Sequence, residues 1–286
     1  MPVYHIVYQT KNTYSLPVRE AVLDFLVLPV ASNDQEIIDV TFETNPEAMP
    51  YTGKNIFGFE FLRFRLKNLA CEFSFTLKAS IKREVVNPFG FIPLPFEEEH
   101  SILRTDSFIL DNYPFFNMGE LTQLPNGYEY PRIKKFESVF DFAKQVNHFV
   151  RNHITYDKNI VDPFRKLEQT VTEKRGVCQD YTHLMLAILR MNQIPSRYVS
   201  GYLNQGGGVV GTGAVHAWVQ VLIPGIGWIG FDPTNNLLED HQYIKIAHGV
   251  DIADCTTLKG VIKGAGTNQT DYRVLVEEQT KRGANQ

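Results

Sequence analysis

The segment of residues 71–81 alternates apolar and polar side chains at every step. Its apolar positions are Cys71, Phe73, Phe75, Leu77, Ala79 and Ile81. Its polar positions are Glu72, Ser74, Thr76, Lys78 and Ser80. Because successive side chains of a strand point to opposite faces, this pattern predicts an antiparallel strand with one buried face.

The sequence before this segment contains further strand candidates, separated by turn residues. They cover residues 4–9, 21–28, 37–44 and 57–66. Asn33-Asp34 is one of the turn signals between them. Several short strands with this spacing are typical of an antiparallel β-sandwich, and we predict a β-rich sandwich domain over residues 1–132.

Residues 87–132 form the last part of this predicted domain and are rich in proline, asparagine and glycine. This composition predicts a connecting segment rather than further strands. The acidic run Glu97-Glu98-Glu99 lies inside it, and we expect these side chains on the solvated surface.

The second half of the chain changes to helical spacing. Ser138 is an expected N-cap, and the apolar stripe after it consists of Val139, Phe142, Ala143, Val146, Val150 and Ile154. A second helix is expected to begin at Cys178 and to end before Pro195. Strands are expected over residues 197–203, 214–222 and 228–232. We therefore predict an α+β core over residues 133–286, including a C-terminal extension.

Charge and cysteine content exclude several classes of protein. The net charge of −4 argues against a nucleic-acid partner. Three scattered cysteines without a CxxC pair predict neither a disulfide framework nor a structural zinc site. We see no signal-peptide pattern and no apolar stretch of about 20 residues, so we expect a cytoplasmic protein without a membrane partner.

Cys178 lies at the start of the second predicted helix, directly after Gly176 and Val177. A helix N-terminus carries about half a positive charge, which favours a thiolate over a thiol. Its N–H groups also lie near the oxyanion that forms when a thiolate attacks a carbonyl carbon. A free cysteine is more often a small core residue, so the catalytic interpretation depends on partners further along the chain.

Two such partners follow on neighbouring predicted strands. Taken alone, His216 would be a structural histidine and Asp232 a turn residue before Pro233. Antiparallel neighbours lie about 4.8 Å apart, so Asp232 can reach a ring nitrogen of His216 and fix its tautomer. We therefore predict Cys178 as nucleophile, His216 as base and Asp232 as orienting acid. His183 is a poorer base, because five residues of helix turn it about 140° away from Cys178.

Four motifs in this order resemble the transglutaminase-like superfamily. They are Gly-Val-Cys-Gln-Asp at 176–180, Gln-Ile-Pro-Ser-Arg-Tyr-Val-Ser-Gly-Tyr at 193–202, His-Ala-Trp-Val at 216–219 and Gly-Trp-Ile-Gly-Phe-Asp-Pro-Thr at 227–234. The resemblance is strong over residues 138–236 and is closest to bacterial transglutaminase-like proteins described as cysteine proteases, in which a β-sandwich domain precedes the core.

This resemblance implies a papain-like α+β core, with the nucleophile at a helix N-terminus that packs on an antiparallel sheet. It places the nucleophile, base and orienting acid of the family on Cys178, His216 and Asp232. The sequence shows no acidic cluster with calcium-loop spacing, so we expect no cofactor and no metal. Tyr156 is a candidate for the second oxyanion donor. The resemblance also implies a peptide or protein substrate.

The activity that follows is acyl transfer from an amide through a thioester. The sequence leaves open whether water accepts the acyl group, as in a protease or amidase, or an amine, as in a transglutaminase. A binding module that holds peptides without turning them over is the contrasting hypothesis. A redox or metal site is disfavoured, because Cys178 has no resolving cysteine and no second metal ligand nearby. The oligomeric state stays open.

Overall fold

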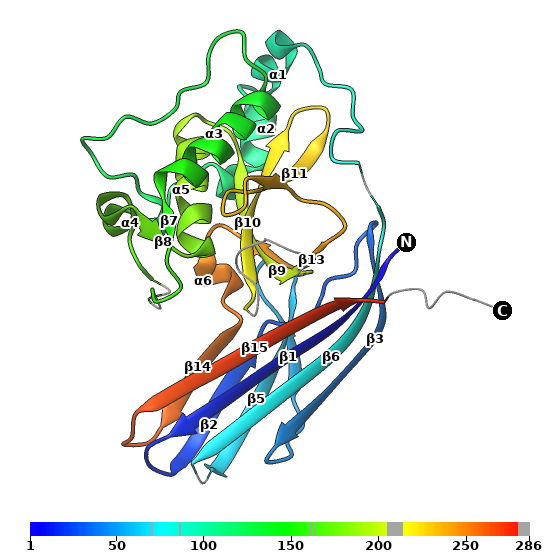
Figure 1. Cartoon of the computed structure of the whole chain (residues 1–286), viewed down its shortest axis with the longest axis vertical. Helices are drawn as coiled ribbons and strands as arrows, with labels where there is room; N and C mark the ends of the chain where they lie inside the picture. Colours follow the sequence, from blue (N-terminus) through cyan, green and yellow to red (C-terminus); the bar gives the residue numbers. More distant parts are fainter. Residues whose placement is uncertain (70, 86, 161, 163, 205–213, 280–286) are drawn as a thin grey trace, which may run out of the picture.

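The computed structural model describes residues 1–279, apart from residues 70, 86, 161, 163 and 205–213. Two layers of antiparallel strands form the lower half of the molecule in Figure 1, and helices packed on a five-stranded sheet form the upper half. The predicted α+β fold class, a β-sandwich with an α+β core, is confirmed.

The sandwich consists of two four-stranded sheets, ordered β15-β1-β6-β3 and β14-β2-β5-β4. Its strands are β1 (Val3–Tyr14), β2 (Val18–Phe25), β3 (Gln35–Asn45), β4 (Tyr51–Lys54), β5 (Glu60–Leu69), β6 (Glu72–Arg83), β14 (Leu258–Lys263) and β15 (Asn268–Glu278). The alternating segment 71–81 corresponds to β6, whose apolar side chains are buried from Phe73 to Ile81. Inside the sandwich, the rings of Phe25 and Phe75 stack with centroids 4.5 Å apart.

The two strands after the core differ from the predicted division of the chain. Residues 133–286 were expected to form one core with an extension, yet β15 pairs with β1 over its whole length and β14 pairs with β2. The C-terminal strands therefore complete the sandwich, because β1 and β2 each have an edge that no N-terminal strand covers.

The connecting segment is helical rather than irregular. It contains the short helices α1 (Phe96–Ile102) and α2 (Asp106–Asp111) and the 3₁₀ turns Tyr113–Phe115 and Glu120–Thr122. The surface assignment of the acidic run is wrong for Glu99, which is fully buried. Its Oε2 accepts a hydrogen bond of 2.9 Å from the N–H of Val139, the first residue of the next helix. That unpaired helix donor explains why a carboxylate is buried here.

The core contains one five-stranded antiparallel sheet, ordered β12-β11-β10-β9-β13. Its strands are β9 (Ser196–Leu203), β10 (His216–Ile223), β11 (Gly227–Asp232), β12 (Leu237–Leu238) and β13 (Tyr243–Gly249), and β7 (Thr155–Tyr156) pairs separately with β8 (Arg175–Gly176). The helices are α3 (Val139–His153), α4 (Leu167–Glu173), α5 (Cys178–Met191) and α6 (Ile252–Cys255). Helix α5 packs on β9 and β10, and α3 packs on α5. Ser138 caps α3 as predicted, since its Oγ accepts from the N–H of Asp141.

Direct hydrogen bonds join the sandwich to the core sheet. The buried hydroxyl of Tyr202 on β9 donates to the carbonyl of Val27 over 2.7 Å. Nε2 of Gln35 on β3 donates to the carbonyl of Lys245 on β13 over 2.9 Å. These contacts fix the core sheet against one end of the sandwich.

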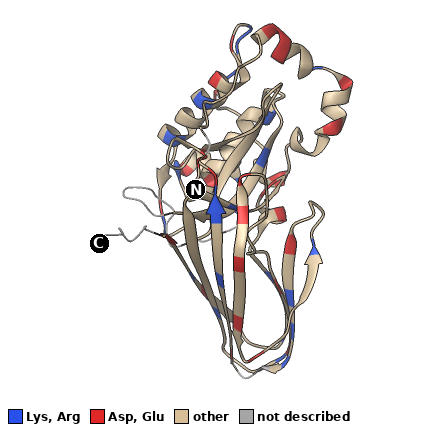
Figure 2. Cartoon of the chain, turned by 90° about the vertical axis from the view of Figure 1, so that its right-hand side faces the viewer, with Lys and Arg blue, Asp and Glu red and all other residues tan. Residues whose placement is uncertain are grey.

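Charges of both signs intermingle along the strands of the sandwich (Figure 2). Lys82 and Lys78 on β6 pair with Glu36 and Glu43 on β3, at 2.9 and 3.5 Å. These exposed pairs contribute little to stability, about 0–1 kcal/mol each. Within the part of the chain that the structure describes, no helix is both long and apolar enough to cross a membrane.

Candidate active site

Cys178 is the first residue of α5 and is partly exposed. The turn before it is held by Asp180, whose Oδ2 accepts from the N–H of Val177 over 2.8 Å. The other oxygen of Asp180 accepts from the hydroxyl of Thr170 over 2.9 Å. A Cβ on Gly176 would lie 2.6 Å from the Cβ of Asp180, so only glycine fits there. The Gly-Val-Cys-Gln-Asp motif therefore forms a tight turn that fixes the position of the thiol at the helix N-terminus.

His216 and Asp232 lie together on neighbouring strands of the core sheet. His216 is the first residue of β10 and Asp232 the last residue of β11, and both side chains are fully buried. Nε2 of His216 lies 2.8 Å from Oδ2 of Asp232. Since a carboxylate accepts, Nε2 carries the proton, and Nδ1 is left to face away from Asp232.

Asp232 accepts five hydrogen bonds, which fix the carboxylate in place. Oδ1 accepts from the backbone N–H groups of Thr234 and Asn235, at 2.9 and 3.3 Å. Oδ2 accepts from His216, from the side-chain amide of Asn235 at 2.7 Å and from the hydroxyl of Tyr243 at 2.9 Å. Sequence reasoning missed Asn235 and Tyr243. Asn235 stands three residues after Asp232, a spacing typical of a local turn, whereas Tyr243 comes from β13 and offered no signal.

The environment favours an ionised His216–Asp232 pair. Burial by itself lowers the pKa of His216, but the Asp232 carboxylate and the Cys178 sulfur raise that pKa above its ordinary value. Burial raises the pKa of Asp232, while His216 and the other donors lower it below its ordinary value. Imidazolium and carboxylate are therefore both stabilised in a site from which water is excluded.

The structure brings Cys178 to the same histidine. The Cys178 sulfur lies close enough to the imidazole of His216 to raise its pKa. Nδ1 of His216 is buried and has no hydrogen-bond partner among the described residues. The three predicted side chains therefore form one cluster, with the imidazole between the thiol and the carboxylate.

Tyr156, the candidate oxyanion donor, lies on β7 and pairs with Gly176, two residues before Cys178. Burial raises the pKa of Tyr156 to about 12, with a further contribution from Cys178. Its hydroxyl therefore keeps its proton at neutral pH. Tyr272 on β15 is 58% exposed, and its pKa is also raised, by partial desolvation first and by Cys178 second.

The other histidine and cysteine side chains considered for catalysis lie away from this cluster. His183 is fully buried, and burial lowers its pKa to about 3. Its Nε2 accepts from the N–H of Ile252, in agreement with the helical spacing that directs it away from Cys178. Cys255 is buried and Cys71 is exposed on the sandwich, so neither thiol belongs to the cluster.

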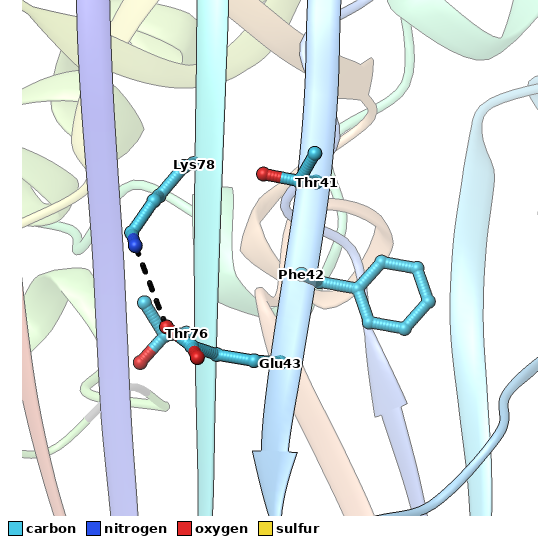
Figure 3. A pocket seen from close by; sticks show the side chains of 5 residues that line it. All are labelled: Thr41, Phe42, Glu43, Thr76 and Lys78. Atoms are coloured by element: carbon cyan, nitrogen blue, oxygen red, sulfur yellow. Dashed lines mark ion pairs between the residues drawn. The ribbon is translucent and has the colours of Figure 1, made fainter.

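A pocket lies on the sandwich and not at Cys178 (Figure 3). It is lined by Thr41, Phe42, Glu43, Thr76 and Lys78. Its one ion pair, Lys78–Glu43, is solvent-exposed, and the pocket holds none of the predicted catalytic residues. Among the described residues, no three His, Cys, Asp or Glu side chains gather as they would around a metal ion.

The chain is similar in sequence to proteins of two mycobacteria. An uncharacterized protein of Mycobacterium leprae is 29% identical over 278 residues, which are 95% of this chain and 96% of that protein. An uncharacterized protein of Mycobacterium tuberculosis is 30% identical over 155 residues, about half of either chain, at 51% and 49%.

A solved structure extends the likeness to the whole fold. It is the structure of a putative cysteine protease from Cytophaga hutchinsonii, which superimposes with a TM-score of 0.70 at 19% identity and covers 99% of this chain and 92% of that chain. The family model of the transglutaminase-like superfamily matches residues 131–233, which include Cys178, His216 and Asp232. Residues 131–233 therefore match the transglutaminase-like superfamily, and the chain as a whole shares the fold of the Cytophaga protein.

Proposed function

We propose that this protein is a cysteine-dependent acyl-transfer enzyme that acts on amide bonds. The observation that carries the proposal is the buried hydrogen bond of 2.8 Å between His216 and Asp232, with the Cys178 sulfur acting on the same imidazole. A thiol, a base and an orienting acid in this order are the groups that a thioester mechanism requires.

In the proposed reaction, the Cys178 thiolate attacks the amide carbonyl carbon, and a tetrahedral oxyanion forms. Backbone N–H groups in the first turn of α5 and the hydroxyl of Tyr156 stabilise that oxyanion. The C–N bond then breaks, and His216 gives its proton to the leaving amine. Asp232 keeps the imidazole in the tautomer that this transfer needs.

Hydrolysis completes the proposed cycle. A water molecule attacks the thioester, His216 takes its proton, and the acid product leaves as the thiol is restored. An amine in place of water gives a new amide, which is the transglutaminase outcome. The proposal favours hydrolysis of a peptide or other amide, by analogy with the Cytophaga protein. With three unpaired cysteines, we place the enzyme in a reducing compartment, the cytoplasm.

The test is mass spectrometry of the intact protein after incubation with a library of peptide amides and a primary amine. An acyl adduct on Cys178 identifies the donor, and the ratio of acid to new amide identifies the acceptor. Cys178→Ala should form no adduct, and His216→Ala should lose about 10²–10⁴-fold in rate. Asp232→Ala should lose less, because it removes orientation and not the base itself.

Cys71→Ala is the matched control, because it removes an exposed thiol outside the cluster. It should react like the wild type. Full turnover by Cys178→Ala would refute the thioester mechanism. Peptide binding by the wild type without any adduct or product would instead support the binding module.

A further inference from the structure

Tyr243 reaches the proposed catalytic carboxylate from the far side of the core sheet. It lies on β13, an edge strand, whereas Asp232 lies on β11. Its side chain is buried, and its hydroxyl donates to Oδ2 of Asp232 over 2.9 Å. That oxygen is the one that accepts from Nε2 of His216. The tyrosine and the histidine therefore donate to the same acceptor atom.

The surroundings of Tyr243 leave its hydroxyl no role in proton transfer. Burial and the neighbouring Asp232 raise the pKa of Tyr243 far above its ordinary value, so the group is a permanent donor. The other charged groups that act on it are Glu239 and Asp240, both from the loop between β12 and β13. His216 and, beyond it, Cys178 complete the titratable groups that face Asp232.

We infer that Tyr243 is a positioning residue, whose hydroxyl holds Oδ2 of Asp232 toward His216 and keeps the carboxylate ionised. The inference rests on the proposed function, because Asp232 matters for catalysis only if Cys178 and His216 transfer acyl groups. A donor to a carboxylate favours its charged form. It also makes that carboxylate less basic, so that the proton of the His216–Asp232 hydrogen bond stays on the imidazole.

Tyr243→Phe tests this inference by removing the hydroxyl while keeping the ring. The proton on Nε2 of His216 gives a downfield NMR signal that needs no substrate. This signal should change at the pH at which Asp232 takes up a proton. In Tyr243→Phe, that pH should rise by about one unit, because one hydrogen bond to a charged group changes the protonation equilibrium about tenfold. In the amide assay, kcat should fall about tenfold with KM unchanged.

Tyr202→Phe is the matched control. The Tyr202 hydroxyl is also buried and donates one hydrogen bond, but to the carbonyl of Val27 and not to the active site. It should lose stability without any change in the NMR titration or in kcat. An unchanged titration in Tyr243→Phe, or an equal shift in Tyr202→Phe, would overturn the inference.

A second substitution covers the case in which Tyr243→Phe does not fold. Site-specific meta-fluorotyrosine at position 243 keeps the hydroxyl and makes it a stronger donor, so the titration should move to lower pH. A movement to higher pH, or none, would overturn the inference. If the titration moves as expected but no acyl adduct forms on Cys178, the positioning of Asp232 stands and the proposed function fails.

Discussion

A single methyl group at Gly176 should destabilise the turn that presents Cys178. In Gly176→Ala, the new Cβ would lie 2.6 Å from the Cβ of Asp180, although ordinary contact begins near 3.4 Å. A Cβ cannot rotate away, so the two backbones must part by about 0.8 Å, the difference between those distances. Such overpacking costs about 1–3 kcal/mol. Losing the hydrogen bond from Val177 to Asp180 costs about 1 kcal/mol more, which gives a total of about 2–4 kcal/mol.

Urea unfolding measures this loss as a lower midpoint with an unchanged slope. The rate at which iodoacetamide alkylates Cys178 should also differ between Gly176→Ala and the wild type, because the thiol moves relative to His216. Peptide mass spectrometry measures this rate. Gly264→Ala is the control, since its Cβ would meet Val18 at an ordinary distance of 3.7 Å. If Gly176→Ala lost less than about 0.5 kcal/mol, the size of an ordinary surface substitution, the steric reasoning would be refuted.

Two further predictions concern buried charges that hold the connecting segment. Burial raises the pKa of Glu99 in the folded state. Its contribution to the stability of the fold is therefore greatest at pH values below the ordinary glutamate pKa, and that contribution is lost as the pH rises through the raised pKa. In urea titrations, Glu99→Gln should therefore gain stability relative to the wild type as the pH rises from 4 to 7, and a constant difference across that range would contradict this reasoning. Arg190 is buried and donates to the carbonyls of Asn117, Ser196 and Val250 at 3.1, 2.8 and 2.7 Å. Arg190→Met should cost about 3–5 kcal/mol by thermal unfolding, because three carbonyls lose their donor, and a loss below about 1 kcal/mol would show that water replaces the guanidinium.

Features that belong to one element could be predicted from its own residues. The alternation of β6 fixes which side chains are buried, and Ser138 identifies the start of α3. Cys178 was expected at the start of a helix, and α5 does begin there. The strand positions of His216 and Asp232 followed from the same local patterns. Their roles in catalysis stay predictions until the adduct experiment is done.

Features that depend on a distant partner could not be predicted in this way. In the sequence, Glu99 belongs to a run of charged residues that predicts a surface position. Its burial is explained by the N–H of Val139, forty residues later, which has no partner within its own helix and donates to the Glu99 carboxylate. The sequence around Tyr243 does not distinguish it from other aromatic residues of strands. Its contact with Asp232 depends on the order of strands in the core sheet. The pairing of β15 with β1 joins segments more than 250 residues apart, as between Thr10 and Asp271. No local periodicity encodes a partner at that separation.

The position of the core, between β6 and β14 of the sandwich, has a consequence for protein synthesis. The ribosome makes the first six strands and the whole of residues 131–233 before β14 and β15 emerge. Until then, β1 has an open edge along the eleven positions that later pair with β15, from Tyr4 to Tyr14. An open edge of this length is a template for pairing with another chain. The nascent chain is therefore most prone to aggregate after Cys178 has been made and before β14 and β15 pair with β2 and β1.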